Sequence, residues 1–233
     1  MISIIIPIYN QADKLEVALL SIKNQSYSDW EIIIVNDGSQ DDPETVFNSF
    51  KASLKNNQKV SFKNQSNQGA PAARNCGLKD AQGDYLFFCD ADANLRPNAL
   101  ARLFNALLDN TQASYAYSSF NWGLKFFKVG EFSAEKLKQM PYIHTMSLIR
   151  RSDFPPTAWD ESIKKFQDWD LWLTMYGQGR IGIFVDEILF TISPGGTISS
   201  WLPSFAYRFF PTLKAVKKYN QALKIIKEKH GLL

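Results

Sequence analysis

The sequence predicts an α/β fold in which helices flank a Rossmann-like, mostly parallel central sheet. Apolar runs rich in β-branched and aromatic residues recur through the first half of the chain, and each ends in a polar turn. Patterns with helical spacing separate these runs, and strands that alternate with helices in this way are typical of parallel βαβ units. With 233 residues, 45% of them hydrophobic and 21% charged, the chain has the length and composition of a globular protein with a sizeable core.

Residues 1–110 are predicted to contain alternating strands and helices. The strands are expected at 2–7, 30–36, 60–63 and 85–90, where the apolar runs lie. The helices are expected at 12–24, 43–55, 70–83 and 97–108. Leu15, Leu19 and Ile22 recur at helical spacing in the first of these, and Pro97 suits the first position of the last.

After residue 110 the pattern loosens. Strands are expected at 113–120, 124–130 and 145–151, a strand or strand pair at 181–193, and helices at 133–140 and 168–179. Trp169 and Trp172 are three residues apart and share one helix face, which predicts core positions for both. No internal repeat, low-complexity tract or clear linker divides the chain, so we expect one domain followed by an amphipathic helix at about 203–229.

The charge of the chain is uneven. Its net charge is +3, but the last 33 residues carry seven basic residues and one acid, so the tail sums to +6 and the first 200 residues to −3. Basic and aromatic residues on one helix suit the surface of an anionic membrane. Docking of the tail on the acidic body is the alternative, and the sequence leaves both open.

The sequence predicts neither a signal peptide nor a membrane span. The first apolar run is short and lacks a basic start, and no stretch reaches the roughly 18 to 20 apolar residues of a span. Cys76 and Cys89 form neither a disulfide framework nor a zinc-site spacing. The expected location is the cytoplasm, at the inner face of the membrane if the tail binds lipid, and no nucleic-acid partner is expected.

Polar side chains follow the predicted strands where the strands end. They are Asn10, Asn36, Asp37, Asp90 and Asp92. The carboxyl ends of parallel strands meet at one edge of a sheet, and ligands bind in the crevice outside that edge. At the end of one strand, Asp90 and Asp92 would point to the same side and could hold Mg²⁺ or Mn²⁺, which prefer oxygen ligands. Capping of the helix at Pro97 by Asp92 or Asn94 is the alternative.

No glycine-rich phosphate loop accompanies these acids. Neither G-x-G-x-x-G after the first strand nor G-x-x-x-x-G-K-[ST] occurs. Their absence argues against a nicotinamide-dependent dehydrogenase and against a P-loop ATPase. The glycine-free stretch PIYNQADKL argues against a sugar-phosphate nucleotidyltransferase. A bound diphosphate would therefore need a metal ion to offset its charge.

Three long stretches resemble the family 2 glycosyltransferases of the GT-A fold. They are SIIIPIYNQADKLEVALLSIKNQSYSDWEIIIVNDGSQDD, NQGAPAARNCGLKDAQGDYLFFCDAD and FQDWDLWL, and together they span nearly residues 2 to 175. The resemblance weakens after about Ile181. It implies a nucleotide-sugar binding half at 1–110, an acceptor-binding half of the same domain at 111–200, and a basic amphipathic C-terminal tail at 201–233.

The resemblance also implies a nucleotide-binding set and a metal ligand. The nucleotide-binding residues would be Pro7, Tyr9, Asp37, Asn67, Gly69, Arg74 and Asp90. The first two would line the nucleobase pocket, Asp37 would bond uracil or ribose, and Arg74 would approach the base and the phosphates. The loop at 67–69 would close over the nucleoside. Asp90 would bond the ribose, and Asp92 would hold Mn²⁺ or Mg²⁺.

Asp168 is the candidate catalytic base. In FQDWDLWL it takes the place of the family's catalytic aspartate, which removes a proton from the acceptor hydroxyl as this hydroxyl attacks the anomeric carbon. A single displacement inverts the sugar, so no enzyme nucleophile is implied. Asp170 lies two residues on and cannot face the same way on a helix. Capping of the helix from Trp169 is the alternative role for Asp168.

Three positions depart from the family pattern. Ala93 stands where a third acid is frequent, Gln167 where a glutamate precedes the base, and Ser193 roughly where a histidine helps the diphosphate or the metal. His144 lies in the acceptor half. We expect it to be a buried structural residue, and contact with the acceptor is the alternative.

The sequence therefore favours an inverting, metal-dependent glycosyltransferase. Its partners would be a nucleotide-sugar donor, UDP-linked, and a glycan or lipid-linked acceptor. The Q-x-x-R-W signature of processive synthases is absent, which predicts one sugar per encounter. The alternative is a catalytically weak nucleotide-sugar binding or partner protein on the same fold, in line with the loss at Ser193.

Overall fold

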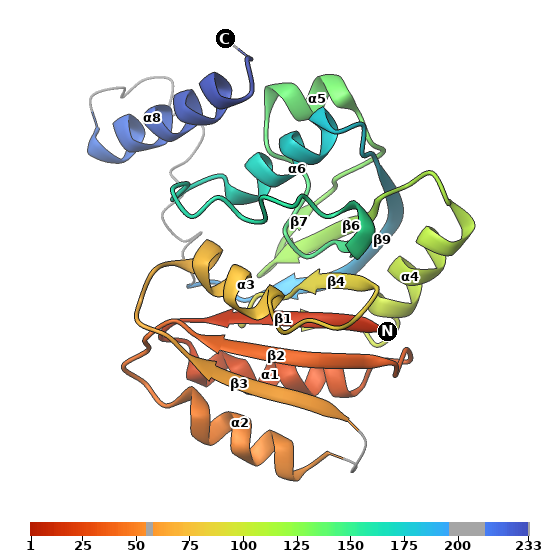
Figure 1. Ribbon diagram of the computed structural model, residues 1–233, viewed down its shortest axis with the longest axis vertical. Coiled ribbons are helices and arrows are strands. Elements are labelled where there is room, and N and C mark those ends of the chain that lie inside the picture. The colour runs from red at the N-terminus through yellow and green to blue at the C-terminus, as the bar shows by residue number, and fades with distance from the viewer. Residues whose placement is uncertain (55–57, 196–212, 233) are drawn as a thin grey trace.

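The computed structural model describes residues 1–54, 58–195 and 213–232, which form a curled central sheet with helices on both faces (Figure 1). The strands are β1 (Ile2–Ile8), β2 (Trp30–Asn36), β3 (Lys59–Asn64), β4 (Tyr85–Phe88), β5 (Ala93–Leu95), β6 (Tyr115–Trp122), β7 (Lys125–Phe127), β8 (Leu148–Arg150) and β9 (Gly182–Ile192). Their order in the sheet is β3-β2-β1-β4-β8-β6-β9-β5, with β7 paired to β6, so β3 and β5 are the edges.

The sheet is mostly parallel where the site is expected. β3, β2, β1 and β4 run parallel to one another, as do β6 and β9. β8, β5 and β7 run antiparallel to their neighbours. The predicted α/β fold with a mostly parallel central sheet is confirmed.

The helices cover both faces of this sheet. They are α1 (Ala12–Lys23), α2 (Pro43–Ala52), α3 (Ala70–Leu78), α4 (Ala99–Asp109), α5 (Ala134–Gln139), α6 (Gln167–Gly177) and α8 (Lys214–Lys229), with a 3₁₀ turn at Arg151–Asp153. In Figure 1, α3 lies in front of β1, whereas α1 is seen behind β2 and β3.

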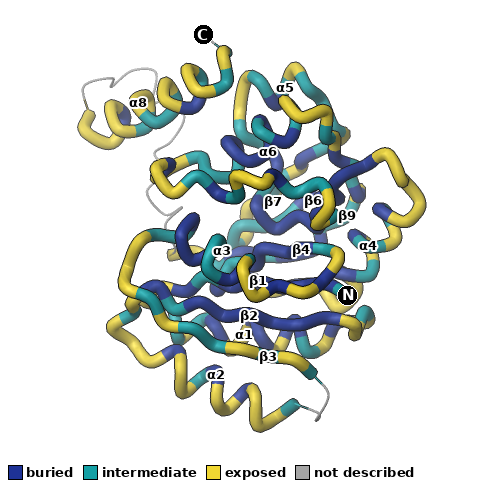
Figure 2. Tube along the Cα trace, viewed as in Figure 1, coloured by how far each residue is buried: buried dark blue, intermediate teal, exposed yellow. Residues whose placement is uncertain are grey.

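The isoleucine-rich sequence of β1 explains why both faces are covered. Ile4 and Ile6 pack in one apolar cluster with residues of α1, α2 and α4, whereas Ile5 packs in a second cluster with residues of α3 and α6. Alternate residues of a strand point to opposite faces, so a strand buried on both sides needs apolar residues throughout. The buried strands form the dark centre of Figure 2. Trp169 and Trp172 are fully buried in the second cluster, as predicted.

Helix α3 ends at Leu78 and not near Gly83. Lys79, Asp80 and Ala81 N–H still donate to carbonyls of the helix, but the next two amides bond to side chains of the sheet. Gln82 N–H donates to Glu31 Oε1 at 2.6 Å, and Gly83 N–H donates to Ser3 Oγ at 2.7 Å. These two bonds draw the chain out of the helix and toward the start of β4.

The region after β4 also differs from the prediction. β4 ends at Phe88, two residues before the predicted end, and β5 was not predicted. α4 begins at Ala99 and not at Pro97, because the carbonyl of Pro97 accepts from Ser26 N–H at 2.8 Å and Arg96 N–H donates to β9. A three-residue strand such as β5 has no periodicity of its own, and it forms because β9 lies beside it.

The second half keeps the predicted elements with shifted bounds. β7 and β8 are shorter than expected, and β9 is one continuous strand with register shifts opposite Ser118 and Ser119. The predicted tail helix is confirmed over Lys214–Lys229, while residues 203–212, with most of the aromatic part of the tail, lie outside the described residues. In the part of the chain that the structure describes, no helix is both long and apolar enough to cross a membrane.

Candidate active site

The carboxyl ends of β1 and β2 meet at one edge of the sheet, as predicted. Asp37 N–H donates to the Ile8 carbonyl at 2.8 Å, and Gln40 N–H donates to Asn10 Oδ1 at 2.7 Å. Asn10 has a φ of 52°, in the left-handed region that asparagine tolerates better than most residues. This bend turns the chain from β1 toward the loop that follows β2.

Asp37 organises the loop before α3. Its Oδ1 accepts from Gln65 Nε2 and from Gln68 N–H, and its Oδ2 accepts from Gly69 N–H, each at 2.8 Å. The residue is 3% exposed, and three of the roughly four lone-pair positions of the carboxylate are used. Asp37 therefore shapes the loop at 67–69, and one lone pair is left for a nucleoside.

The residues predicted to face a nucleobase lie at or near the surface. Tyr9 is 46% exposed and Asn67 is exposed, whereas Pro7 and Gly69 are half-buried. An exposed tyrosine ring just past the end of β1 has the face that stacks on a base. Gly69 has a φ of 96°, a conformation that favours glycine, and it directly precedes α3.

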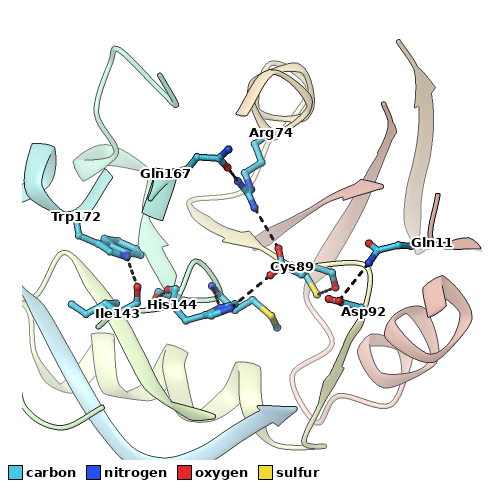
Figure 3. A network of polar contacts seen from close by, with 11 residues as sticks. Gln11, Arg74, Cys89, Asp92, Ile143, His144, Gln167 and Trp172 are labelled. Atoms are coloured by element: carbon cyan, nitrogen blue, oxygen red, sulfur yellow. Dashed lines mark hydrogen bonds and ion pairs between the residues drawn. The ribbon is translucent and has the colours of Figure 1, made fainter. Parts of the chain in front are cut away.

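Arg74 reaches from α3 across the site (Figure 3). One terminal nitrogen donates to Gln167 Oε1 at 2.9 Å, and the other lies 3.4 Å from Asp90 Oδ1. The guanidinium lies 4.7 Å from the ring centre of Trp159. Among the described residues the buried Nε of Arg74 has no partner. Arg74 thus connects the acidic turn after β4 with the first residue of α6 and keeps one N–H for a ligand.

Asp90 lies opposite a histidine whose side chain is only 10% exposed. His144 Nε2 lies 3.8 Å from Asp90 Oδ2, whereas Nδ1 accepts from Met146 N–H at 3.1 Å. The second bond places the ring proton of the neutral form on Nε2, toward Asp90. Phe120 and Phe190 flank the ring, and burial lowers the pKa of His144. His144 is largely shielded from solvent, as expected, but its contact with Asp90 makes it part of the site and not only a structural residue.

Asp92 does not continue a strand with Asp90. β4 ends at Phe88 and residues 91–92 form a turn, so the prediction that strand alternation places both carboxylates on one side is wrong. In Figure 3, Asp92 and His144 lie on opposite sides of Cys89. The capping alternative is also wrong, because the N-cap of α4 is Asn98 and no side chain caps that helix.

The environment of Asp92 fits a divalent cation. The residue is 8% exposed, and burial together with the charge of Asp90 raises the pKa of Asp92 to about 6. Among the described residues its side-chain donor is Gln11 Nε2, at a long 3.5 Å. No group of three or more His, Cys, Asp or Glu side chains gathers in the described ranges. A cation would therefore need substrate phosphate oxygens as further ligands, which is the usual arrangement for Mg²⁺.

Ser193 lies beside Asp92. It directly follows β9, and its N–H donates to the Asp92 carbonyl at 2.9 Å. The position from which the family resemblance expects a metal or diphosphate contact is therefore next to the acidic turn. A serine hydroxyl is a weaker ligand than an imidazole, so this chain offers less to a cation there.

Asp168 lies in the first turn of α6. The N-cap of this helix is Phe166, so the alternative that Asp168 caps the helix is wrong. Its Oδ1 accepts from Trp169 N–H at 2.9 Å. Burial raises the pKa of Asp168, and the charges of His144 and Arg74 partly oppose this rise. A partly shielded carboxylate with a raised pKa has the properties of a general base.

Asp170 faces away from Asp168, as predicted. It is 4% exposed and lies 2.9 Å from Lys229 Nζ and 2.8 Å from His230 Nε2, both at the C-terminal end of α8. Of the two acids in this turn, Asp168 is therefore the one that the charges of Arg74 and His144 reach.

Sequence reasoning missed several partners of the predicted residues. Gln11, next to Asp92, directly follows the strand-end residue Asn10, and that position was the one available signal. Trp159, beneath Arg74, comes from a segment without periodicity. The contact between His144 and Asp90 joins residues 54 positions apart and has no local signal.

Comparison with family models matches residues 3–155 to a family described as glycosyl transferase family 2. An uncharacterised glycosyltransferase of Rickettsia prowazekii is 32% identical over 206 residues, which cover 81% of this chain and 62% of that protein. Another, from Haemophilus influenzae, is 38% identical over 122 residues, which cover 50% of this chain and 48% of that protein. The chain thus matches about half to three fifths of the length of these relatives.

Solved structures with a similar fold include S. aureus TarS and a mannosyltransferase. Residues 1–349 of S. aureus TarS, in complex with UDP-GlcNAc, give a TM-score of 0.71 at 18% identity and cover 98% of this chain and 72% of that chain. The mannosyltransferase PcManGT from Pyrobaculum calidifontis, in complex with GDP-Man and Mn²⁺, gives 0.71 at 17% identity and covers 99% of this chain and 69% of that chain. At such identities the likeness shows the fold alone.

Proposed function

We propose a reaction for this chain, which belongs to glycosyl transferase family 2 and has the GT-A fold. The chain transfers a sugar from a nucleotide sugar, UDP-linked, to a hydroxyl of a glycan or lipid-linked acceptor, with inversion and one sugar per encounter. The observation that carries this proposal is the position of Arg74, which contacts both Asp90 of the acidic turn and Gln167 at the start of α6. Arg74 thus connects the residues proposed to bind the nucleotide sugar with the helix that carries the proposed base, Asp168.

The donor half binds the nucleotide. Tyr9 stacks on the base beside Pro7, and Asp90 bonds the ribose. Asp37 holds the loop at 67–69 in place through its three hydrogen bonds. The Nε–H of Arg74, which has no partner among the described residues, donates a hydrogen bond to the nucleotide sugar. TarS and PcManGT structures with UDP-GlcNAc and GDP-Man support a nucleotide-sugar donor for this chain.

Asp92 is the protein ligand of a divalent cation, Mn²⁺ or Mg²⁺. When bound, the cation offsets the negative charge that builds up on the leaving diphosphate. The under-bonded, buried carboxylate of Asp92 supports this role, as does the Mn²⁺ in the PcManGT complex. Gln11 orients the carboxylate from the β1 side.

Asp168 activates the acceptor. Its carboxylate takes the proton of the acceptor hydroxyl while the hydroxyl oxygen forms a bond to the anomeric carbon and the bond from this carbon to the diphosphate breaks. The raised pKa of Asp168 supports this role, because a general base works best when its pKa lies near the pH at which the enzyme operates. The charges of His144 and Arg74 oppose this rise and favour the ionised form of Asp168.

The second candidate is a nucleotide-sugar binding protein with weak catalysis. Ser193 beside Asp92 favours it, because a hydroxyl holds a metal or diphosphate less firmly than an imidazole. Donor binding without hydrolysis or transfer across a broad acceptor panel would support this candidate. Turnover at about 1 s⁻¹ or faster with any acceptor in the presence of Mn²⁺ would exclude it.

A thermal-shift screen tests the donor and the metal together. We expect UDP and UDP-sugars to raise the melting temperature with Mn²⁺ and much less without it, because a ligand that binds the folded state alone stabilises it by mass action. At 100 times the dissociation constant the gain is about 2.7 kcal/mol, which is roughly 5 to 10 °C for a chain of this size. ADP is the control. Stabilisation that is equal with ADP, or independent of Mn²⁺, would contradict the proposal.

The basic outer side of α8 contacts an anionic membrane. Lys214, Lys217, Lys218 and Lys224 are exposed on this helix. We expect the chain to float with vesicles that contain phosphatidylserine and not with phosphatidylcholine alone. Lys217→Glu/Lys218→Glu should reduce binding roughly 30-fold or more, at about 1 kcal/mol for each lysine near the surface.

A matched reversal, Lys51→Glu/Lys59→Glu on α2 and β3, lies at the opposite end of the molecule in Figure 1 and should leave flotation unchanged. Equal flotation of all three proteins would exclude α8 as the membrane contact.

A further inference from the structure

The C-terminal helix packs on the helix that carries Asp168. α8 lies close to α6 in Figure 1. Ile226 of α8 is fully buried in the same apolar cluster as Trp169 and Trp172, and Leu223 packs against this cluster. The described part of the tail is therefore docked on the body through one face.

The contact includes an ionic cluster around the buried Asp170. The Asp170 carboxylate has Lys229 Nζ at 2.9 Å and His230 Nε2 at 2.8 Å. Lys229 Nζ also donates to Asp160 Oδ2 at 2.6 Å, and this bond lowers the pKa of Asp160 to about 2. Burial lowers the pKa of Lys229, but its bonds to the two aspartates outweigh burial, so the pKa is raised. A buried carboxylate that loses such partners is strongly destabilised, so the end of α8 keeps Asp170 in place.

A second contact holds the residue before α6. Phe166 is the N-cap residue of α6 and has a φ of 61°. No side-chain hydrogen bond caps the helix at this end. Left-handed backbone is costly for a bulky residue and persists when the surroundings enforce it. The ring of Phe166 lies 5.1 Å from that of Tyr219 on α8 and 5.9 Å from that of Trp169. α8 therefore contacts α6 on both sides of Asp168, at Phe166 and at Asp170.

We propose that Lys229 and His230 are positioning residues that fix the first turn of α6 and, with it, the side chains of Asp168 and Gln167. They act through Asp170 and touch no substrate. Gln167 is the residue that Arg74 contacts, so the same turn supports both sides of the site. The inference rests on the proposed function where it names Asp168 as the base.

The test compares two full-length double variants. Lys229→Met/His230→Phe removes both polar partners of Asp170 and keeps their bulk, whereas Lys229→Arg/His230→Gln keeps donors at both positions. Gln221→Ala is the control on the same helix, since Gln221 is exposed and belongs neither to the ionic cluster nor to the lysines of the outer side. Backbone hydrogen exchange at 167–173 is measured without ligand. Turnover with UDP-sugars and Mn²⁺ and the affinity for UDP with Mn²⁺ are measured in parallel.

In the first variant we expect exchange at 167–173 to be about 10-fold faster or more and exchange in α3 to be unchanged. Turnover should fall by about 10- to 100-fold, since a small displacement of a catalytic group has an effect of this size. UDP affinity should stay within about twofold, because Arg74 keeps its contact with Asp90 when Gln167 shifts and the other donor contacts lie on other elements. The conservative double variant and Gln221→Ala should behave as the wild type.

Unchanged exchange at 167–173 in the first variant would overturn the proposal, and so would equal losses of UDP affinity and turnover. If that variant does not fold, Lys229→Met and His230→Phe alone each leave Asp170 one partner, and the same comparison decides. A wild-type chain without transfer activity would count against the proposed reaction, whereas the exchange data would still decide whether α8 fixes α6.

Discussion

Asp168→Asn is expected to lower turnover by a factor of about 10² to 10⁴ while donor and metal binding stay in place. Asparagine keeps the size of the side chain and can still accept the hydrogen bond from Trp169 N–H, but it cannot take the acceptor proton. The N-cap of α6 is Phe166, so the substitution removes no cap, and the free energy of unfolding should not fall. Transfer rates at saturating donor and acceptor are the measurement.

The pH profile gives a second measure of the same residue. Burial raises the pKa of Asp168, and a base acts in its ionised form. Wild-type turnover should therefore fall as the pH drops through this raised pKa, and the residual activity of Asp168→Asn should lack this decline. Asp186→Asn, an exposed position on β9, is the control and should keep the wild-type rate. A fully active Asp168→Asn protein would show that another group is the base.

Asp92→Asn is expected to remove the Mn²⁺-dependent part of UDP binding and to raise the stability of the metal-free protein at neutral pH. The folded-state pKa is about 6 against an ordinary value of 3.8, so burial penalises the ionised form. This penalty is absent below the ordinary pKa, grows between the two values, and reaches about 3 kcal/mol at pH 7. Asparagine carries no charge, so the gain should appear at pH 7 and vanish near the ordinary carboxylate pKa.

Calorimetric titration of UDP with and without Mn²⁺, together with urea unfolding at two pH values, measures both effects. Asp109→Asn, at the exposed end of α4, is the control and should change neither. An unaltered response to Mn²⁺ in Asp92→Asn would exclude Asp92 as the metal ligand. A helix cap would instead lose about 0.5 to 2 kcal/mol in Asp92→Ala at every pH, and Asn98 already occupies the cap position of α4.

The first half of the fold could be predicted because its strands are buried on both faces. Such strands need continuous apolar runs, and these are visible in β1 and β2 without any structure. β5 could not be predicted, since three residues have no period and their pairing with β9 joins segments about 100 positions apart. The end of α3 could not be predicted either. The backbone amides of Gln82 and Gly83 bond to the side chains of Glu31 and Ser3, which lie on strands distant in the sequence.

The residues of the site also divide into those that the sequence could place and those that it could not. Residues at strand ends, such as Asp37, Asp90 and Asp92, could be placed at one edge from topology alone. Their side-chain partners could not, because they depend on how loops and helices pack. Asp170 shows the limit most clearly. The sequence alone predicts a mild effect of Asp170→Asn on the transfer rate, whereas the burial of Asp170 and its bonds to α8 predict a loss of about 1 to 3 kcal/mol in the free energy of unfolding.

The place of β3 at the edge of the sheet bears on how the protein behaves at high concentration. An edge strand presents unpaired backbone groups, which can pair with a strand of another molecule and start aggregation. β3 carries Lys59, which is exposed, and Lys63, which pairs with Asp80 at 2.7 Å. A second copy aligned on this edge would bring lysines close to lysines and would have to desolvate them. The two lysines therefore allow the sheet to end in solvent without recruiting another chain.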